Sequence, residues 1–353
     1  MNYEIARHVS MLGGRVFLVA DAVDPDLLDM GCQWVPVVPL LRKPNLLKVC
    51  EFARRSTRAL QSLDERVDVV HGHGFTLTCR HDVNTAHMVH SAWKRSPANR
   101  RCDPPGVRSL YHSLYTHLNA RWETGTYAKA RAVVAVSRRV QDELSNLNPL
   151  PRDVRVIRNG VDLAEFAPGT IDRAEVGLPA GVPMLLFAGD LQTGLKNLNS
   201  VLQAVRLVSG CHLAVVGQID RSPFPKLAAD LQIADRVHFL GFRTDLPKIM
   251  RAADVFVFPS RYESFSLVLL EAMASGLPII TARTVGAAEL VGDAGVVLED
   301  PNDVPGLVSS IQEFIANGDM RRCMGVKART IAEQHSWERM ASEYVRLYEE
   351  IFG

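Results

Sequence analysis

The chain has 353 residues, of which 47% are hydrophobic and 22% are charged, and its formal net charge is +1. This composition is typical of a soluble globular protein of about two domains, and the near-zero charge argues against a general nucleic-acid-binding protein. The first 168 residues are net positive and the remainder net negative, which favours an anionic partner for the first half.

The six cysteines are scattered and form no CxxC pair, which predicts reduced thiols rather than a disulfide framework or a zinc site. No apolar run approaches the roughly 18 residues needed to span a bilayer, and the N-terminus has no apolar region of the signal-peptide kind. We therefore expect a cytoplasmic protein. Peripheral contact with the inner face of a membrane stays open.

Strand and helix patterns alternate along the first half of the chain, which predicts an α/β domain with a parallel sheet. Short apolar runs predict strands at residues 15–21, 67–74, 82–90, 132–137 and 154–160. Helical periodicity predicts helices at residues 46–63 and 120–130.

The second half continues this alternation. It predicts strands at residues 184–190, 211–217, 237–242, 255–260, 277–282 and 294–299, with helices at 195–208 and 246–253 among them. A segment rich in Pro, Gly and acidic residues, 162–183, predicts the boundary between two Rossmann-like domains. We place these domains at 1–168 and 169–336, and expect the amphipathic helix of residues 337–353 to pack back on the first.

Two glutamates stand in the apolar stretch of residues 255–282. Glu263 follows a buried strand, and Glu271 is the only polar residue of a predicted helix at 267–274. Burying an unpaired carboxylate costs several kcal/mol, and its seven apolar neighbours disfavour a surface position for Glu271. Glu263 taken alone would be an ordinary turn residue.

The strand, this helix and the next strand form one βαβ unit, and ligands of such sheets bind at the carboxyl ends of the strands. Ser264 or Ser266 can cap the helix, and Gly276 fits the position after its last turn. The helix start suits a phosphate, and carboxylates accept hydrogen bonds from sugar hydroxyls. We predict a nucleotide-sugar site, with Glu263 at the hexose, the helix start at the pyrophosphate and Glu271 at the ribose.

The segment E-S-F-S-L-V-L-L-E-A-M-A-S-G-L-P-I-I resembles the E-x7-E signature of glycosyltransferase family 4. Other motifs of the family occur in the expected order: NGVD (159–162), FAGD (187–190), LKNL (195–198), VVG (215–217), RVHFLGF (236–242) and AADVFVFPS (252–260). The resemblance implies a retaining glycosyltransferase of the GT-B fold, in which two Rossmann-like domains face each other across a cleft. It also implies a UDP- or GDP-linked sugar donor, a glycan, lipid-linked or small-molecule acceptor, and no cofactor.

By this resemblance, the donor site would be formed by Gly189, Lys196, Ser264, Phe265, Ser266, Leu267 and Glu271, with Phe242 and Arg243 beside the base. Lys196 would pair with the donor phosphates. The alternative interpretation is that Lys196 is an ordinary lysine exposed to solvent. Asp190 stands where the family often has an arginine. Because an aspartate cannot pair with a pyrophosphate, we expect another cation or a different loop arrangement there.

The strand predicted at 82–90 resembles a family strand that ends in a histidine beside the reacting sugar. His87 or His90 could be that histidine, and for both the alternative is a structural histidine of the core. His71 and His73 stand at the end of another predicted strand. No further ligand is positioned by the sequence, so we expect no metal site there.

A basic run follows this strand and holds Lys94, Arg95, Arg100, Arg101 and Arg108. Such a run is usually a solvated loop. Its place after the acceptor-side strand makes contact with an anionic acceptor or a membrane surface the second interpretation. We assign His73, Lys94 and Arg95 to the acceptor side.

The beginning of the chain departs from the family. Members of the family open with a strand and a Gly-rich loop, whereas here residues 3–21 resemble the first helix and the second strand. We therefore expect either that the start of the chain is truncated or that the N-terminal domain lacks its first strand and exposes a sheet edge.

The resemblance implies a metal-independent reaction with retention at the anomeric carbon, helped by positioning and by stabilisation of the leaving diphosphate at the helix start and Lys196. His87, His90 and Glu263 are the candidate catalytic residues. Two alternatives stay open: a catalytically weak nucleotide-sugar-binding subunit, suggested by Asp190 and the missing strand, and a nucleotide-sugar epimerase. A dehydrogenase is disfavoured because no G-x-G-x-x-G follows a strand.

Overall fold

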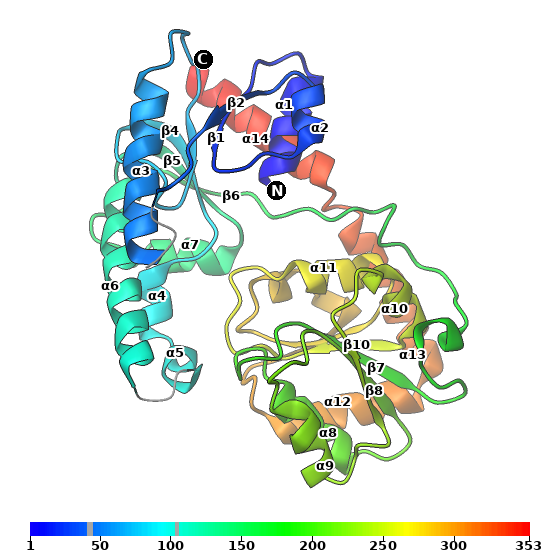
Figure 1. The fold of residues 1–353 in the computed structure, drawn as a ribbon. Coiled ribbons are helices and arrows are strands. Elements are labelled where there is room, and N and C mark those ends of the chain that lie inside the picture. Colours follow the sequence, from blue (N-terminus) through cyan, green and yellow to red (C-terminus); the bar gives the residue numbers. More distant parts are fainter. Residues whose placement is uncertain (41–44, 103–105) are drawn as a thin grey trace. The chain divides into compact units, whose positions relative to one another are not determined.

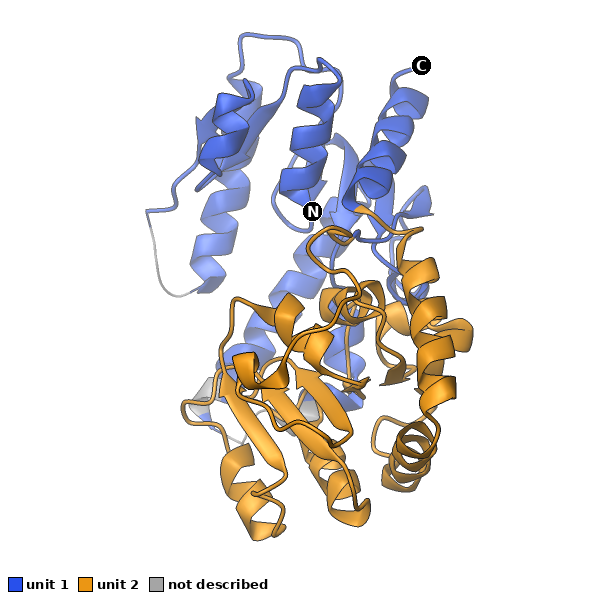
Figure 2. Ribbon diagram, turned by 90° about the vertical axis from the view of Figure 1, so that its right-hand side faces the viewer, with its two compact units in different colours: residues 1–99, 103–160, 337–353 blue, residues 100–102, 161–336 orange. Residues whose placement is uncertain are grey.

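The computed structural model describes residues 1–40, 45–102 and 106–353, without the side chains of 100–102, 107 and 108. The chain divides into two compact units. Unit 1 comprises residues 1–99, 103–160 and 337–353, and unit 2 comprises residues 161–336 together with 100–102 (Figure 2). The division thus falls after residue 160, where the sequence analysis placed it after 168, and the C-terminal helix belongs to unit 1.

Unit 1 contains two parallel sheets. The smaller one pairs β1 (Phe17–Ala20) with β2 (Gln33–Pro36). The larger one has four strands in chain order, β3 (His71–His73), β4 (His81–Ala86), β5 (Ala130–Ala135) and β6 (Val154–Val156). Within the described residues no strand precedes the first helix, α1 (Asn2–Met11).

Further helices complete this part of the chain. They are α2 (Pro25–Asp29), α3 (Asn45–Gln61), α4 (His90–Arg95), α5 (Pro97–Cys102), α6 (Val107–Tyr127), α7 (Arg138–Leu144) and α14 (Trp337–Phe352). The first and last helices of the chain, α1 and α14, lie side by side in this unit (Figure 1). Ile5 of α1 and Tyr344 of α14 share one buried cluster with Val83 of β4 and Val134 of β5, so burial of apolar surface holds α14 on this unit.

Three details of unit 1 differ from the sequence-based expectation. Strand β2 was not predicted, because its residues are mostly exposed and show no buried alternation. The basic run after β4 is not a loop: residues 90–95 and 97–102 are helical, and α6 begins at Val107 instead of 120. Residue 130, predicted to be helical, begins β5.

Unit 2 contains one six-stranded parallel sheet in the order β12-β11-β10-β7-β8-β9. Its strands are β7 (Met184–Ala188), β8 (His212–Val216), β9 (Val237–Gly241), β10 (Val255–Phe258), β11 (Ile279–Ala282) and β12 (Gly295–Leu298). Its helices are α8 (Leu198–Leu207), α9 (Phe224–Asp230), α10 (Leu246–Ala252), α11 (Leu267–Ala274), α12 (Val304–Ala316) and α13 (Gly318–Ala332), with short 3-10 turns at Arg173–Val176, Gly286–Leu290 and Gly292–Ala294.

The strand order of unit 2 positions a ligand site. From β7 the chain proceeds to β8 and β9 on one side, and then returns to β10, β11 and β12 on the other. Every residue of β7 and β10 is buried, as expected for central strands of a parallel sheet. The order reverses between β7 and β10, and a crevice for ligands forms at such a point beyond the carboxyl ends of the strands.

Candidate functional site

A pocket of about 510 Å³ lies at this point of unit 2. Its walls come from the residues that follow β7, β8, β9 and β10 and from the first turns of α11. Of the ten donor-site residues predicted from the sequence, eight line it: Gly189, Lys196, Phe242, Arg243, Glu263, Ser266, Leu267 and Glu271. Residues far apart in the sequence thus meet in one site.

The start of α11 faces this pocket with an unusual backbone. Ser266 is the N-cap residue, but its side chain makes no capping hydrogen bond. Its φ is +90°, a region that L-residues other than glycine avoid. The helix ends as expected, with Gly276 in the left-handed region at φ +77°. The pocket is therefore bounded by a helix start to which the N-cap side chain of Ser266 gives no capping bond.

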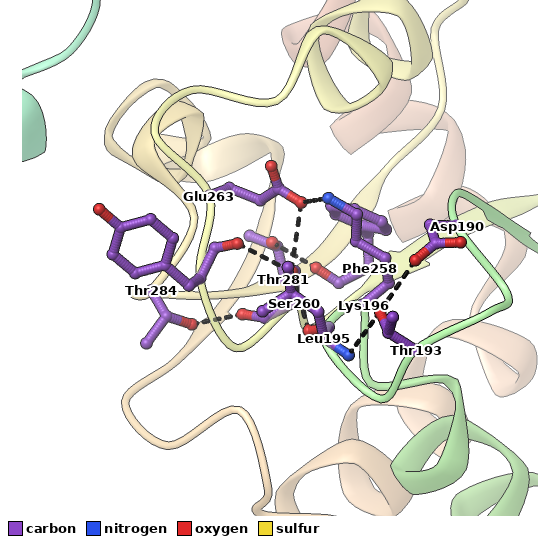
Figure 3. A network of polar contacts seen from close by, with 10 residues as sticks. Asp190, Thr193, Leu195, Lys196, Phe258, Ser260, Glu263, Thr281 and Thr284 are labelled. Atoms are coloured by element: carbon purple, nitrogen blue, oxygen red, sulfur yellow. Dashed lines mark hydrogen bonds and ion pairs between the residues drawn. The ribbon is translucent and has the colours of Figure 1, made fainter. Parts of the chain in front are cut away.

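Glu263 and Lys196 form an ion pair in the pocket at the carboxyl ends of the strands, and both side chains are largely buried. Figure 3 shows the Lys196 ammonium pointing at the Glu263 carboxylate, which also accepts a bond from the Ser260 hydroxyl at 3.3 Å. The backbone of Glu263 is held as well, because its N–H donates to the Thr284 carbonyl at 3.1 Å. The carboxylate is thus fixed from two sides.

Glu271 is half-buried one to two turns into α11. Burial, and to a smaller degree the charge of Glu165, raise its pKa from 4.5 to about 7. No hydrogen bond to its carboxylate is found among the described residues. A partly desolvated carboxylate in a ligand pocket is a candidate functional group, since hydroxyl donors from a ligand would satisfy it.

Asp190 also lines the pocket, and its carboxylate organises its own loop. It accepts bonds from the Gln192 N–H at 2.9 Å and the Thr193 hydroxyl at 2.8 Å (Figure 3). The loop is therefore arranged around an acceptor instead of presenting a cation. The second cation of the pocket is Arg243, which makes two bonds with Asp245 at 2.7 and 2.6 Å.

Two glycines bring the strand ends close together. The carbonyl oxygen of Gly189 lies 2.2 Å from where a Cβ of Gly217 would be, so no side chain fits at that position. A Cβ on Gly189 would meet the Phe258 ring at 3.3 Å. Because neither glycine has a side chain, the backbone segments that follow β7 and β8 can approach each other closely at the floor of the pocket.

Two predicted donor residues do not line the pocket. Phe265 is buried in the core, and its carbonyl accepts a bond from the Ala287 N–H at 2.7 Å. Ser264 is also absent from the pocket wall. The sequence analysis missed Ala188, Val216, Phe258 and Val268 as lining residues, since an apolar side chain carries no chemical signal of its own.

The predicted residues of unit 1 divide into two groups. His87 follows the carboxyl end of β4, and its Nε2 lies 3.4 Å from Nδ1 of His73, which ends β3. His71, on the same strand, contacts the Tyr348 hydroxyl at 2.7 Å and Thr85 at 2.8 Å. Burial lowers the pKa of His71 to about 3 and that of His73 well below its ordinary value, so both rings are neutral at pH 7.

His90 has a different partner. It is the first residue of α4, and its Nδ1 lies 2.6 Å from Oε2 of Glu123, a carboxylate of α6 with only 3% of its side chain exposed. The other oxygen of Glu123 accepts the backbone N–H of His90, also at 2.6 Å. Sequence reasoning did not predict this pair, because the two residues are 33 positions apart.

The first two cations of the basic run lie on α4 and are exposed. Lys94 lies 2.9 Å from Nδ1 of His117, and Arg95 is exposed at the end of α4. The side chains of Arg100, Arg101 and Arg108 lie outside the described part of the chain. Over the described ranges, no helix is long and apolar enough to cross a bilayer, and no group of three or more His, Cys, Asp or Glu side chains could hold a metal ion.

Comparison with known proteins assigns the chain to a class. Residues 1–165 match the family described as Glycosyltransferase Family 4, and residues 170–331 match Glycosyl transferases group 1. The chain belongs to glycosyltransferase family 4. A D-inositol 3-phosphate glycosyltransferase of Corynebacterium jeikeium is 33% identical over 62% of this chain. The chain spans 57% of the length of that relative, and 49% and 58% of two further ones.

Solved structures show the fold. Sucrose-phosphate synthase from Thermosynechococcus elongatus superposes with a TM-score of 0.80 at 20% identity, covering 99% of this chain and 92% of that one. An Anabaena protein, HepE, in complex with UDP and glucose gives a TM-score of 0.67 at 18% identity, covering 98% and 95%. The chain therefore has the GT-B fold, with two Rossmann-like domains.

Proposed function

We propose that this chain transfers a hexosyl group, with retention, from a nucleoside-diphosphate sugar to a hydroxyl of a glycan, a lipid-linked sugar or a small molecule. The observation that carries the proposal is the pocket of unit 2, where the uncapped start of α11 lies between Glu263 and Glu271. Helix N–H groups suit a diphosphate, and carboxylates accept bonds from sugar hydroxyls. The HepE complex with UDP and glucose supports a UDP-linked donor, with a GDP-linked one as the alternative.

The ion pair between Lys196 and Glu263 has a role in this proposal. A donor diphosphate offers Lys196 a stronger counter-charge than a single carboxylate does. Its arrival would draw Lys196 away and leave Glu263 free to accept a hydroxyl of the hexose. The leaving diphosphate would then be stabilised by Lys196 and the helix start, which is electrostatic stabilisation of the transition state.

Substituting Glu263→Gln tests this role. The amide keeps the shape but weakens the hydroxyl bond and removes the partner of Lys196, so we expect turnover to fall by about a hundredfold or more. Glu313→Gln on the exposed surface of α12 is the matched control and should keep full turnover. Unchanged turnover in Glu263→Gln would remove the assigned role. Donor binding by calorimetry without any turnover in the wild type would support a binding subunit instead.

For the acceptor side we propose His87 as the histidine beside the reacting sugar. It directly follows the carboxyl end of β4 and its ring is exposed, whereas the ring of His90 is engaged by buried Glu123. His87→Ala is expected to lower kcat far more than His90→Ala, measured under the same donor and acceptor concentrations. The opposite order would assign the role to His90.

In this proposal Lys196 and the start of α11 balance the negative charge of the donor diphosphate, so the reaction needs no metal ion. Turnover is therefore expected to be the same with and without an excess of EDTA. Restoration of a lost activity by added Mg²⁺ or Mn²⁺ would contradict this part of the proposal.

We also propose that the protein is cytoplasmic and contacts the inner face of a membrane. This contact is supported by the exposed positions of Lys94 and Arg95, since clustered cations are attracted to anionic lipid at about 1 kcal/mol each. Replacing both with Gln should weaken sedimentation with anionic vesicles, while neutral vesicles serve as the control. Equal sedimentation of both proteins would refute the membrane contact.

A further inference from the structure

A second pocket lies entirely within unit 1. It has a volume of about 330 Å³ and opens between α3 and α6, which run side by side in Figure 1. Its residues are all different from those of the donor pocket. The volume is at the lower end of the range found for small-molecule sites.

Three cations line this pocket: Arg54 of α3, Arg121 of α6 and Lys129 just before β5. No acidic residue of the described chain is part of its wall. Lys129 donates to the Thr78 carbonyl at 2.6 Å, and neither arginine forms an ion pair with any carboxylate of the described ranges. Three cations gathered without a counter-charge favour an anionic ligand.

An aromatic pair forms the apolar side of the same pocket. The rings of Phe75 and Trp122 are stacked, with centroids 5.2 Å apart and planes at 27°. Both side chains are only partly buried, so ring surface remains open to the pocket. Planar groups stack on such ring surfaces, as bases stack on aromatic side chains in nucleic-acid recognition.

The pocket is also pre-formed and has room. Thr78 is bound to α3 through the Thr57 hydroxyl, which accepts its N–H at 2.9 Å, and Thr126 of α6 donates to the Leu77 carbonyl at 3.3 Å. Gly125 lies in the interior of α6 and lines the pocket, although glycine is less favourable than alanine inside a helix. A Cβ at this position would meet no atom within 4 Å, so no packing contact requires the glycine. It leaves space where a ligand can lie.

We propose that this pocket binds a small phosphate-bearing molecule with a planar ring. The phosphate would lie among Arg54, Arg121 and Lys129, and the ring against Trp122. Phosphate oxygens accept charge-assisted bonds from guanidinium groups, which present several donors in one plane. The inference is independent of the transfer reaction proposed for unit 2.

Phenyl phosphate is the simplest probe of this chemistry. It is titrated calorimetrically into the full chain and into the Lys196→Ala variant, which has lost the lysine of the donor pocket, alongside phenol and inorganic phosphate. We expect phenyl phosphate to bind at least about tenfold more tightly than either fragment, because it alone uses both halves of the pocket. No binding, equal binding of phenol, equal binding of inorganic phosphate, or loss of binding in Lys196→Ala would each overturn the proposal.

Variants distinguish this pocket from general surface charge. Arg54→Gln and Arg121→Gln should each weaken the binding of phenyl phosphate by about tenfold, the usual effect of losing a charge-assisted hydrogen bond. Arg58→Gln, an exposed cation of α3 outside the pocket, is the control and should bind like the wild type. Gly125→Leu fills the pocket while favouring the helix, and should abolish binding with no loss of thermal stability. Wild-type affinity in Gly125→Leu, or an equal loss in Arg58→Gln, would refute the assignment.

Discussion

Replacing Glu271 by Gln should stabilise the protein in the absence of a donor, in a pH-dependent way. In the folded chain its pKa is about 7, against 4.5 for an ordinary glutamate. The folded state therefore holds a proton that the unfolded state releases between these two values. Each pKa unit corresponds to 1.36 kcal/mol, so ionised Glu271 costs the fold about 3 kcal/mol above pH 7.

The sign of the effect follows from this proton. Because the folded pKa is raised, the wild type loses stability as the pH increases from about 4.5 to 7, and the cost is complete above that window. Gln does not ionise and carries none of this cost. The gain of Glu271→Gln over the wild type should thus be small at pH 4.5, grow up to pH 7 and stay constant above it.

The measurement is urea unfolding of both proteins at pH 4.5, 6 and 8, compared at matched ionic strength. Glu313→Gln on the surface of α12 is the matched control, since it removes an exposed carboxylate. A gain at pH 8 of well under 1 kcal/mol, or an equal gain at all three values, would refute the reasoning. The same variant should show a smaller thermal shift with UDP at pH 8, because the acceptor for the ribose hydroxyls is weakened.

The remaining predictions concern the backbone around the donor pocket. Ser266→Gly should raise the free energy of unfolding by up to about 1 kcal/mol, because only glycine is relaxed at φ +90°; Ser264→Gly should give no such gain in the same urea assay. Gly217→Ala should cost at least about 2 kcal/mol, because its Cβ would lie 2.2 Å from a carbonyl oxygen. Gly210→Ala, which has a positive φ but open space, should cost only about 1 kcal/mol, and equal costs would refute the steric argument.

Most residues that line the pocket of unit 2 could be predicted from sequence because they lie in local patterns. Glu271 stands alone in an apolar helix, and Glu263 stands in the turn that a βαβ unit places at the carboxyl edge of the sheet. Contacts between distant segments could not be predicted in this way. The Lys196–Glu263 ion pair joins residues 67 positions apart, and the partner of His90 is a glutamate on α6 that no motif marks.

Elements of unit 1 show the same limit. Strand β2 is an exposed edge whose short sequence lacks a buried face, so no periodicity identifies it. The basic run after β4 resembles a loop by composition, yet it is largely helical, because helix formation depends on the apolar face that packs and not on the charges that remain exposed. Composition therefore predicted that the charges of this segment are exposed to solvent, but it did not predict that the backbone is helical.

The donor pocket holds more acceptors than cations, and this balance bears on how it recognises a diphosphate. Asp190 is occupied by its own loop, Lys196 by Glu263 and Arg243 by Asp245. In the proposed function, a diphosphate would have to displace a carboxylate to obtain a side-chain cation, whereas Ser266 makes no capping bond that it would have to displace at the start of α11. Because a helix start cannot be exchanged for another partner, it would supply the fixed part of phosphate recognition, and the ion pairs would supply the part that changes when the donor arrives.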